Sequence, residues 1–254
     1  MENQLLLSLT AGIFIGGAAG YTGSLMLSKR MALVAGPLGH LTLPGIALAL
    51  LYGFNVSLTA FPFVILGIVL IWLLEMRTKL PMEALTAIVF ASGVAITFLF
   101  LPIEQAETAL VGDISRITFW ETIISVAVSI SLVIVLKKIY SEMILINISE
   151  DLARSERIGV KKYNLVYLLS IAIIVALGVK MVGGLLTAAL VAIPASAARS
   201  ISRNLAHYAF GAMVIGMISS SLGILLAELS EFPAGPLIIL VNALIFLISI
   251  VFKK

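Results

Sequence analysis

The chain has 254 residues, of which 61% are hydrophobic and only 11% are charged, and its formal net charge is +3. A soluble domain is nearer half apolar and a quarter charged, so this composition predicts an all-α, polytopic transmembrane helical bundle. The sequence contains no cysteine, which excludes disulfides, thiolate metal sites and cysteine catalysis, and only His40 and His207 can supply imidazole groups.

Apolar runs long enough to cross a bilayer recur along the chain. The first begins at the N-terminus, where Glu2 stands in place of the basic residues of a signal peptide, so we expect a span that is retained. The expected spans are 4–27, 31–54, 58–76, 82–101, 117–137, 164–181, 184–198, 208–227 and 236–252. The seventh is short and the second is interrupted by prolines and glycines, so either can be interpreted as a half-span, which leaves eight or nine complete spans.

The distribution of basic residues predicts the orientation. With the N-terminus outside, fourteen of the sixteen Lys and Arg residues fall on the cytoplasmic side, and only Arg116 and Lys180 fall outside. The outer loops carry acidic residues instead: Glu104, Glu107, Asp113, Glu228 and Glu231. We therefore expect a multi-pass protein of the plasma or inner membrane with a cytoplasmic C-terminus. Residues 1–254 would form one transmembrane domain with a cytoplasmic loop at 138–163.

In the first span, Gly12, Gly16 and Gly20 are four residues apart and share one helix face. Small residues in such a row let two helices approach closely. We interpret the row as a packing surface without a role in transport chemistry.

The second span contains VAGPLGHLTLPGIALA, residues 34–49, with His40 in its middle and no charged residue. Pro44 has no N–H and therefore frees the carbonyl four residues before it, that of His40. Ionisable side chains and freed backbone at membrane depth face a cavity or pathway, and histidine is a common ligand of transition metals. The alternative is a packed histidine bonded to a neighbouring helix; we favour the pathway.

One cytoplasmic segment, ISEDLARSERIGV, covers residues 148–160. Glu150 and Asp151 come first, Arg154 follows and Gly159 closes the segment, which predicts a short helix with a glycine stop. A solvated connector and a docking surface for a soluble partner are equally compatible with this pattern.

A second segment, VGGLLTAALVAIPASAARSISR, covers residues 182–203. A short apolar span ends at Pro194, and small residues, Arg199, Arg203 and finally His207 follow it. The pattern fits either a tight helical hairpin with basic residues inside or a short helix gripped by a partner at the cytoplasmic face. We expect His207 to be exposed or interfacial and not a ligand.

Near the outer face, ELSEFPAGPLIIL places Glu228 and Glu231 three residues apart, so they can share one helix face. They can receive a cation or only hydrate the boundary.

The sequence has no GxxxxGK[ST] phosphate-binding loop, and neither histidine has a plausible serine and acid for a catalytic triad. We expect that the chain is not an enzyme and binds no cofactor. Energy for driven transport would come from ATP used by another chain.

Four segments together resemble the metal-ion permeases of the ABC-3 family. LSKRMALVAGPLGHLTLPGIALA is similar to that family's basic turn, aspartate, Ser-His pair and Leu-Pro-Gly. ISEDLARSERIGV resembles its cytoplasmic loop, and VGGLLTAALVAIPASAARSISR resembles its Val-Gly, Pro-Ala and Ala-Arg segment. ELSEFPAGPLIIL is similar to its closing segment of Ser, acid, Pro and Gly, and the four occur in the family's order.

The resemblance implies a permease with a type II ABC importer fold that takes up zinc, manganese or iron as a homodimer or paired assembly. Two cytoplasmic ATPase subunits and an extracytoplasmic solute-binding protein would be its partners, with no nucleic acid. The implied path residues are His40 and Glu231, with backbone at Gly36, Gly39, Pro44 and Gly45. The implied ATPase contacts lie in 150–159 and in the coupling segment 195–208, with Glu150, Asp151, Arg154, Gly159, Pro194, Ala198, Arg199 and Arg203 as candidates.

The sequence departs from the family at two positions of the path. Gly36 aligns with the family aspartate and Gly39 with the serine before the histidine, so His40 lacks its carboxylate partner. A single neutral imidazole is a poor site for manganese, which prefers oxygen ligands. A type II permease for a metal chelate, such as a siderophore, haem or cobalamin, is therefore the first alternative. An ATPase-independent carrier is less favoured, because the spans carry no acidic residue at mid-depth for proton coupling.

Overall fold

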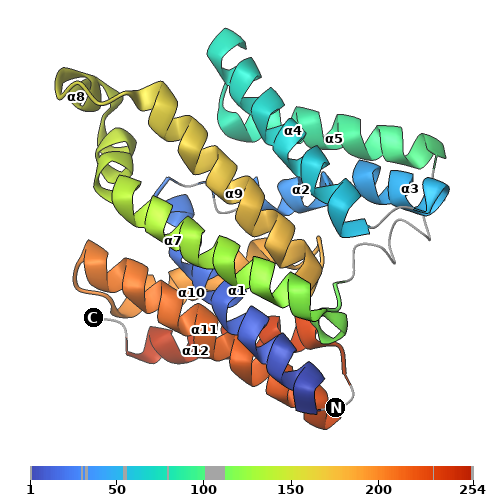
Figure 1. Cartoon of the computed structure of the whole chain (residues 1–254). Helices are drawn as coiled ribbons and strands as arrows, with labels where there is room; N and C mark the ends of the chain where they lie inside the picture. The colour runs from blue at the N-terminus through green and yellow to red at the C-terminus, as the bar shows by residue number, and fades with distance from the viewer. Residues whose placement is uncertain are drawn as a thin grey trace.

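The computed structural model describes residues 2–29, 31, 34–53, 56–78, 80–100, 112–230 and 232–252, and these form helices and short connections (Figure 1). The helices are α1 (Glu2–Ser28), α2 (Ala35–His40), α3 (Leu43–Tyr52), α4 (Val56–Thr78), α5 (Met82–Phe100), the short 3-10 helix η2 (Ile114–Arg116), α7 (Phe119–Ile148), α8 (Glu150–Ser155), α9 (Val160–Val182), α10 (Thr187–Ile201), α11 (Leu205–Ser230) and α12 (Ala234–Val251). The expectation of an all-α bundle is confirmed for this part of the chain.

The helices form two groups that meet at α9 and α10. In the larger group α1 runs between α7 and α11, while α10 packs against α1, α11 and α12 (Figure 1). In the smaller group α2 to α5 pack on one another, and they contact the larger group through α9 and α10. The main buried core extends through both groups, so the fold is held by apolar packing across their junction.

The predicted glycine row of α1 is a packing surface, as expected. A side chain at Gly16 would overlap the backbone of Gly216 in α11, and one at Gly20 would overlap the carbonyl of Ala212. Gly23 continues the row against the carbonyl of Val191 in α10. The backbones of α1 and α11 therefore touch directly, which only residues without a side chain allow.

Within the described ranges, eight helical segments are long and apolar enough to cross a membrane, and they correspond to eight of the nine expected spans. The second of them, Ala35–Tyr52, consists of α2 and α3 with a break between them. The remaining expected span, 184–198, is the shorter apolar helix α10. Of the two segments that could be half-spans, the second span is thus a broken helix and the seventh is a short helix.

The helix of the fifth span continues beyond the expected membrane boundary at residue 137, because α7 ends only at Ile148. Its last 11 residues extend the helix by roughly 16 Å. Two apolar side chains in this extension, Met143 and Ile146, are almost fully buried, so tertiary packing continues the helix beyond Lys137 and Lys138. The expected cytoplasmic loop 138–163 is consequently mostly helix.

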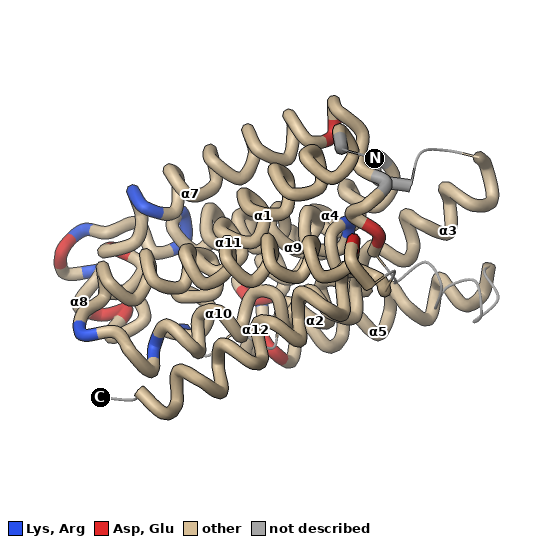
Figure 2. The backbone as a smooth tube through the Cα atoms, turned by 90° about the horizontal axis from the view of Figure 1, so that it is seen from below, with Lys and Arg blue, Asp and Glu red and all other residues tan. Residues whose placement is uncertain are grey.

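The two termini lie at opposite ends of the bundle (Figure 2). Most of the Lys and Arg residues in that view gather at the end that carries α8 and the C-terminus. This separation fits an odd number of crossings, with α10 as the ninth, and it agrees with the charge asymmetry of the sequence.

Candidate functional site

The second span is broken beside its histidine. α2 ends at His40, Leu41 and Thr42 form a turn, and α3 begins at Leu43 with Pro44 in its first turn. The Thr42 hydroxyl donates to the carbonyl of Gly39 at 2.7 Å, which satisfies one carbonyl released by the break. Pro44 has no N–H to offer the carbonyl of His40, so polar backbone is available beside the imidazole.

His40 is partly buried and has an uncommitted ring nitrogen. Its Nδ1 atom is shielded from solvent and has no hydrogen-bond partner among the described residues. One neighbour is Phe90 of α5, whose ring centroid is 5.4 Å away. A neutral imidazole nitrogen without a donor can accept a hydrogen bond or ligate a cation, so the alternative of a histidine bonded to a neighbouring helix does not hold for this atom.

The three glycines around the break differ in the space they offer. A side chain at Gly36 would meet only the methyl group of Ala188, with 3.5 Å between the two Cβ atoms, which is an ordinary contact. A side chain at Gly39 would approach the carbonyl oxygen of Gly184 to 2.7 Å, and one at Gly45 would overlap the backbone of Thr59. Gly39 and Gly45 are therefore required by packing, whereas Gly36 is not.

The second predicted path residue, Glu231, lies outside the described residues. Its neighbour Glu228 lines an outer groove of about 340 Å³ together with Gln4, Ser8 and Ser115. No group of three or more His, Asp or Glu side chains within the described ranges is close enough to hold a metal ion. His40 is thus the one predicted path side chain that lies within the described residues.

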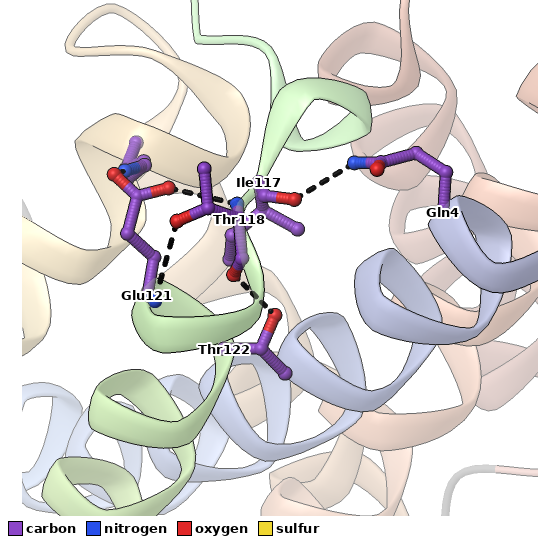
Figure 3. A network of polar contacts seen from close by, with 6 residues as sticks. Gln4, Ile117, Thr118, Glu121 and Thr122 are labelled. Carbon is purple, nitrogen blue, oxygen red and sulfur yellow. Dashed lines mark hydrogen bonds and ion pairs between the residues drawn. The ribbon is translucent and has the colours of Figure 1, made fainter.

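The end of the bundle where α1 and α7 begin carries polar contacts that the sequence alone did not reveal. Gln4 of α1 donates from Nε2 to the carbonyl of Ser115 at 2.8 Å. The same nitrogen donates to the carbonyl of Ile117 at 2.8 Å (Figure 3). Thr118 and Glu121 form a capping box at the start of α7, and the Glu121 carboxylate also pairs with Lys180 of α9. These contacts connect α1, α7 and α9, and the capping-box spacing was the only signal visible in the sequence.

At the end of the bundle that carries the C-terminus, α8 forms where the acidic and basic residues predicted a short helix. Ser149 caps its start, since the Ser149 hydroxyl accepts from the Leu152 N–H at 3.2 Å. Glu150 and Arg154 form an exposed ion pair at 3.3 Å, one turn apart, and Asp151 is exposed beside them. The exposed charges leave α8 available for contact with another protein.

The predicted glycine stop of α8 is wrong. Arg157 takes the left-handed conformation with φ of 59°, and the N–H of Ile158 reaches back to the carbonyl of Ala153 at 2.9 Å. This pattern is a Schellman motif with arginine at the position that glycine normally occupies. Gly159 instead precedes α9 as its N-cap residue, with negative φ.

The other predicted coupling segment is the end of α10 and its turn into α11. Pro194 and Ala198 are buried in the bundle, whereas Arg199 and Arg203 are exposed. The Asn204 side chain accepts from the N–H of His207 at 2.8 Å and caps α11. His207 is exposed, as predicted.

The two predicted coupling segments are not brought together. One groove of about 490 Å³ lies beside α8, with Glu142 and Leu145 of α7 on its wall. Another of about 470 Å³ lies beside the turn from α10 to α11, with Ile144, Asn147 and Ile148 of α7 on its wall. The last turns of α7 therefore border both grooves.

Lys29 was predicted only as a basic residue of a cytoplasmic turn, yet it is largely buried. Its Nζ donates to Oδ1 of Asn164 at 2.9 Å and lies 5.3 Å from the ring centroid of Tyr167. Burial lowers the pKa of Lys29, and the carboxylates of Glu75 and Glu150 partly oppose this shift. The ammonium group fastens the end of α1 to the start of α9.

Known proteins resemble this chain in sequence and in fold. A profile of the ABC 3 transport family matches residues 1–253. The high-affinity zinc uptake system membrane protein ZnuB of Buchnera aphidicola is 26% identical over 249 residues, covering 94% of each chain. The manganese import system permease protein ScaB of Streptococcus gordonii is 25% identical over 246 residues, covering 95% of this chain and 88% of that one. The solved structure of PsaBC from Streptococcus pneumoniae in complex with Fab has the same fold, with a TM-score of 0.80 and 22% identity over 95% of this chain and 89% of that one.

Proposed function

The chain belongs to the ABC 3 transport family, and we propose that it is the membrane permease subunit of an ABC importer for a divalent transition metal. The observation that carries the proposal is the family match over residues 1–253, together with two relatives named for zinc and manganese uptake. The chain would provide the path and perform no covalent chemistry. A separate ATPase would supply the energy, and a solute-binding protein would deliver the ion outside.

The path would pass the break between α2 and α3. There the free Nδ1 of His40 and the carbonyl released by Pro44 offer a nitrogen and an oxygen to an ion that leaves its water shell. Few ligands mean weak binding, which suits a path, because an ion that binds tightly leaves slowly. Two copies in a homodimer would bring two such sites to one assembly.

On the cytoplasmic side, α8 and the turn from α10 to α11 would contact the ATPase. α10 suits this role because it contacts α2, which carries His40, and ends at the cytoplasmic turn. A displacement of the turn by the ATPase would thus reach the broken span through one packed helix. Glu150, Asp151 and Arg154 would form the second contact.

The test is uptake of zinc, manganese and iron by cells with and without the gene, and by cells that carry His40→Ala. We expect metal uptake to depend on the gene and to fall in the variant. Lys137→Ala is the control, because it shortens an exposed side chain of α7 that lies in neither the path nor the two coupling segments, and it should leave uptake unchanged. Equal metal uptake in the presence and absence of the gene would overturn the proposal.

A metal chelate is a second candidate substrate, because Gly36 and Gly39 leave the path without the carboxylate and hydroxyl of the family pattern. A path with few charged ligands suits a ligand that carries its own coordination shell. Competition between free metal and chelate in the same uptake measurement separates the candidates. Inhibition by excess free metal supports the ion, and inhibition by the chelate alone supports the chelate.

A further inference from the structure

The groove beside the turn from α10 to α11 contains buried polar groups without partners. The amide of Asn147, at the end of α7, has both its nitrogen and its oxygen shielded from solvent, and neither atom has a hydrogen-bond partner among the described residues. The hydroxyl of Tyr208 is in the same situation, and this residue is only 6% exposed. Both side chains line the groove. Buried polar groups in proteins are nearly always paired, so these three atoms are open to a partner that enters the groove.

The same groove carries two unpaired positive charges. Arg199 and Arg203 line it from the end of α10 and from the following turn, and both are exposed. Neither guanidinium has an ion-pair partner in the part of the chain that the structure describes. The two guanidinium groups, the Asn147 amide N–H and the Tyr208 O–H can all donate, and only the Asn147 amide oxygen requires a donor in return. The set therefore favours a ligand with oxygen acceptors and a negative charge.

The depth of the groove favours a protein carboxylate over a lipid phosphate. Lys137 and Ile148 are 11 residues apart on α7, which places them on nearly the same helix face and about 16 Å apart along the axis. An exposed lysine at the end of an apolar run lies at the level of the lipid head groups. The groove, at the level of Ile148, is therefore on the cytoplasmic side of that layer.

The rim of the groove has the character of a protein interface. Ile148 is 73% exposed and Leu205 is 50% exposed, and both line the groove. Apolar side chains that surround a polar centre exclude water when a partner binds, which strengthens charged hydrogen bonds at that centre.

We propose that this groove receives an acidic side chain of the ATPase subunit, held by Arg199 and Arg203 and by the donors of Asn147 and Tyr208. The inference rests on the proposed function, because it names the chemistry by which the coupling segment would grip its ATPase. It adds two residues, Asn147 and Tyr208, that the motifs of the sequence did not indicate.

The first experiment identifies the occupant. A photo-crosslinking amino acid replaces Leu205 in the full chain, which is co-expressed with its cognate ATPase, and mass spectrometry identifies the crosslinked peptide. We expect an ATPase peptide that contains Asp or Glu. A crosslink to lipid, or to an ATPase peptide without an acidic residue, would overturn the inference.

The second experiment measures ATPase affinity in phosphatidylcholine nanodiscs. Arg203→Glu should weaken binding at least tenfold, and reversing the charge of the crosslinked acid should restore most of it. Tyr208→Phe, which removes only the hydroxyl, should weaken binding several-fold. Lys137→Glu is the matched control, because it makes the same charge change outside the groove and should bind within twofold of the wild type. Unchanged affinity for both Arg203→Glu and Tyr208→Phe would contradict the inference.

Different results would contradict the proposed permease function and the assignment of the groove. If no ATPase associates with the wild-type chain, the proposed function itself is wrong. If the ATPase binds and uptake is normal but the groove variants behave as the wild type, only the groove assignment is wrong. Phosphatidylglycerol that stabilises the wild type but not Arg203→Glu, with equal ATPase affinity, would assign the groove to lipid instead.

Discussion

At the scale of single residues, Gly36 is the most informative position of the path. The neighbouring glycines are required by contacts with backbone, whereas Gly36 has room for a side chain. It lies one helical turn before His40, so a side chain there would share a face with the imidazole. Nothing in the packing explains why this position lacks a carboxylate.

Gly36→Asp should therefore be tolerated and should create a second ligand beside His40. We expect the KM for manganese uptake to fall on the order of tenfold, the scale on which single groups change metal affinity. Gly39→Ser is the contrasting variant, since its side chain would meet the Gly184 carbonyl, and it should lower the Tm of the purified protein. A loss of folded protein in Gly36→Asp would contradict the open space beside Ala188.

Arg157 adopts a backbone conformation that costs an arginine about 1 kcal/mol relative to glycine. Arg157→Gly should raise the Tm of the purified protein, because glycine takes this conformation without strain. Arg157→Ala removes the same charge but keeps the strain, so it should leave the Tm near that of the wild type. Equal shifts in both variants would attribute the effect to the charge.

At the scale of elements, the junction between α1 and α9 depends on Lys29. Its pKa is lowered in the folded protein, so between this value and the unfolded value of about 10.4 the unfolded chain binds more protons. The free energy of unfolding should therefore rise as pH increases through this window, because the folded protein releases the buried charge. At lower pH both states carry the proton and the cost of burying it is constant.

The measurement is thermal unfolding from pH 7 to pH 10.5 for the wild type and Lys29→Gln. The Tm of the wild type minus the Tm of Lys29→Gln should increase as the pH rises. Taking the difference removes the contributions of the other lysines and of the tyrosines. A constant difference across the range would show that Lys29 does not titrate in the window.

Element boundaries could be predicted where hydropathy decides them and not where packing does. α1, α5 and α12 match the expected spans closely, because their ends coincide with polar or helix-breaking residues. Hydropathy places the end of the fifth span at Lys137 but does not show that the helix continues to Ile148, where Met143 and Ile146 are buried by packing. The end of α8 was predicted at Gly159, but the backbone turns two residues earlier, at Arg157. Arginine has no preference for the left-handed conformation, so the residue type at this position does not indicate a turn.

The residues of the candidate site could likewise be predicted only in part. His40, Pro44 and the break between α2 and α3 could be predicted from local sequence, because proline removes an N–H wherever it stands. Asn147 and Tyr208 could not, because they come from helices that are distant in sequence and become neighbours only in the folded chain.

At the scale of the whole molecule, the charge asymmetry predicts which end faces the cytoplasm. The sequence contains no cysteine, so a single introduced cysteine reports on one position without removal of others. Ser155→Cys, at the end of α8, should react with a membrane-impermeant maleimide only after the cells are opened. Leu229 is 83% exposed and lies near the C-terminal end of α11. Leu229→Cys should therefore react in intact cells. The reverse pattern would invert the topology and place α8 out of reach of a cytoplasmic ATPase.

The direct contact between the backbones of α1 and α11 has a mechanical consequence. At Gly16 and Gly20 the backbone of α1 lies against the backbone of α11 with no room for a side chain, so a rotation of α1 that turned larger residues into this contact would force the two helices apart. α2 to α5 reach the remaining helices through α9 and α10, and their own second span is already divided at Leu41 and Thr42. Motion during a transport cycle would therefore concentrate in that smaller group, with the divided span as its hinge and the α1–α11 pair as the fixed frame.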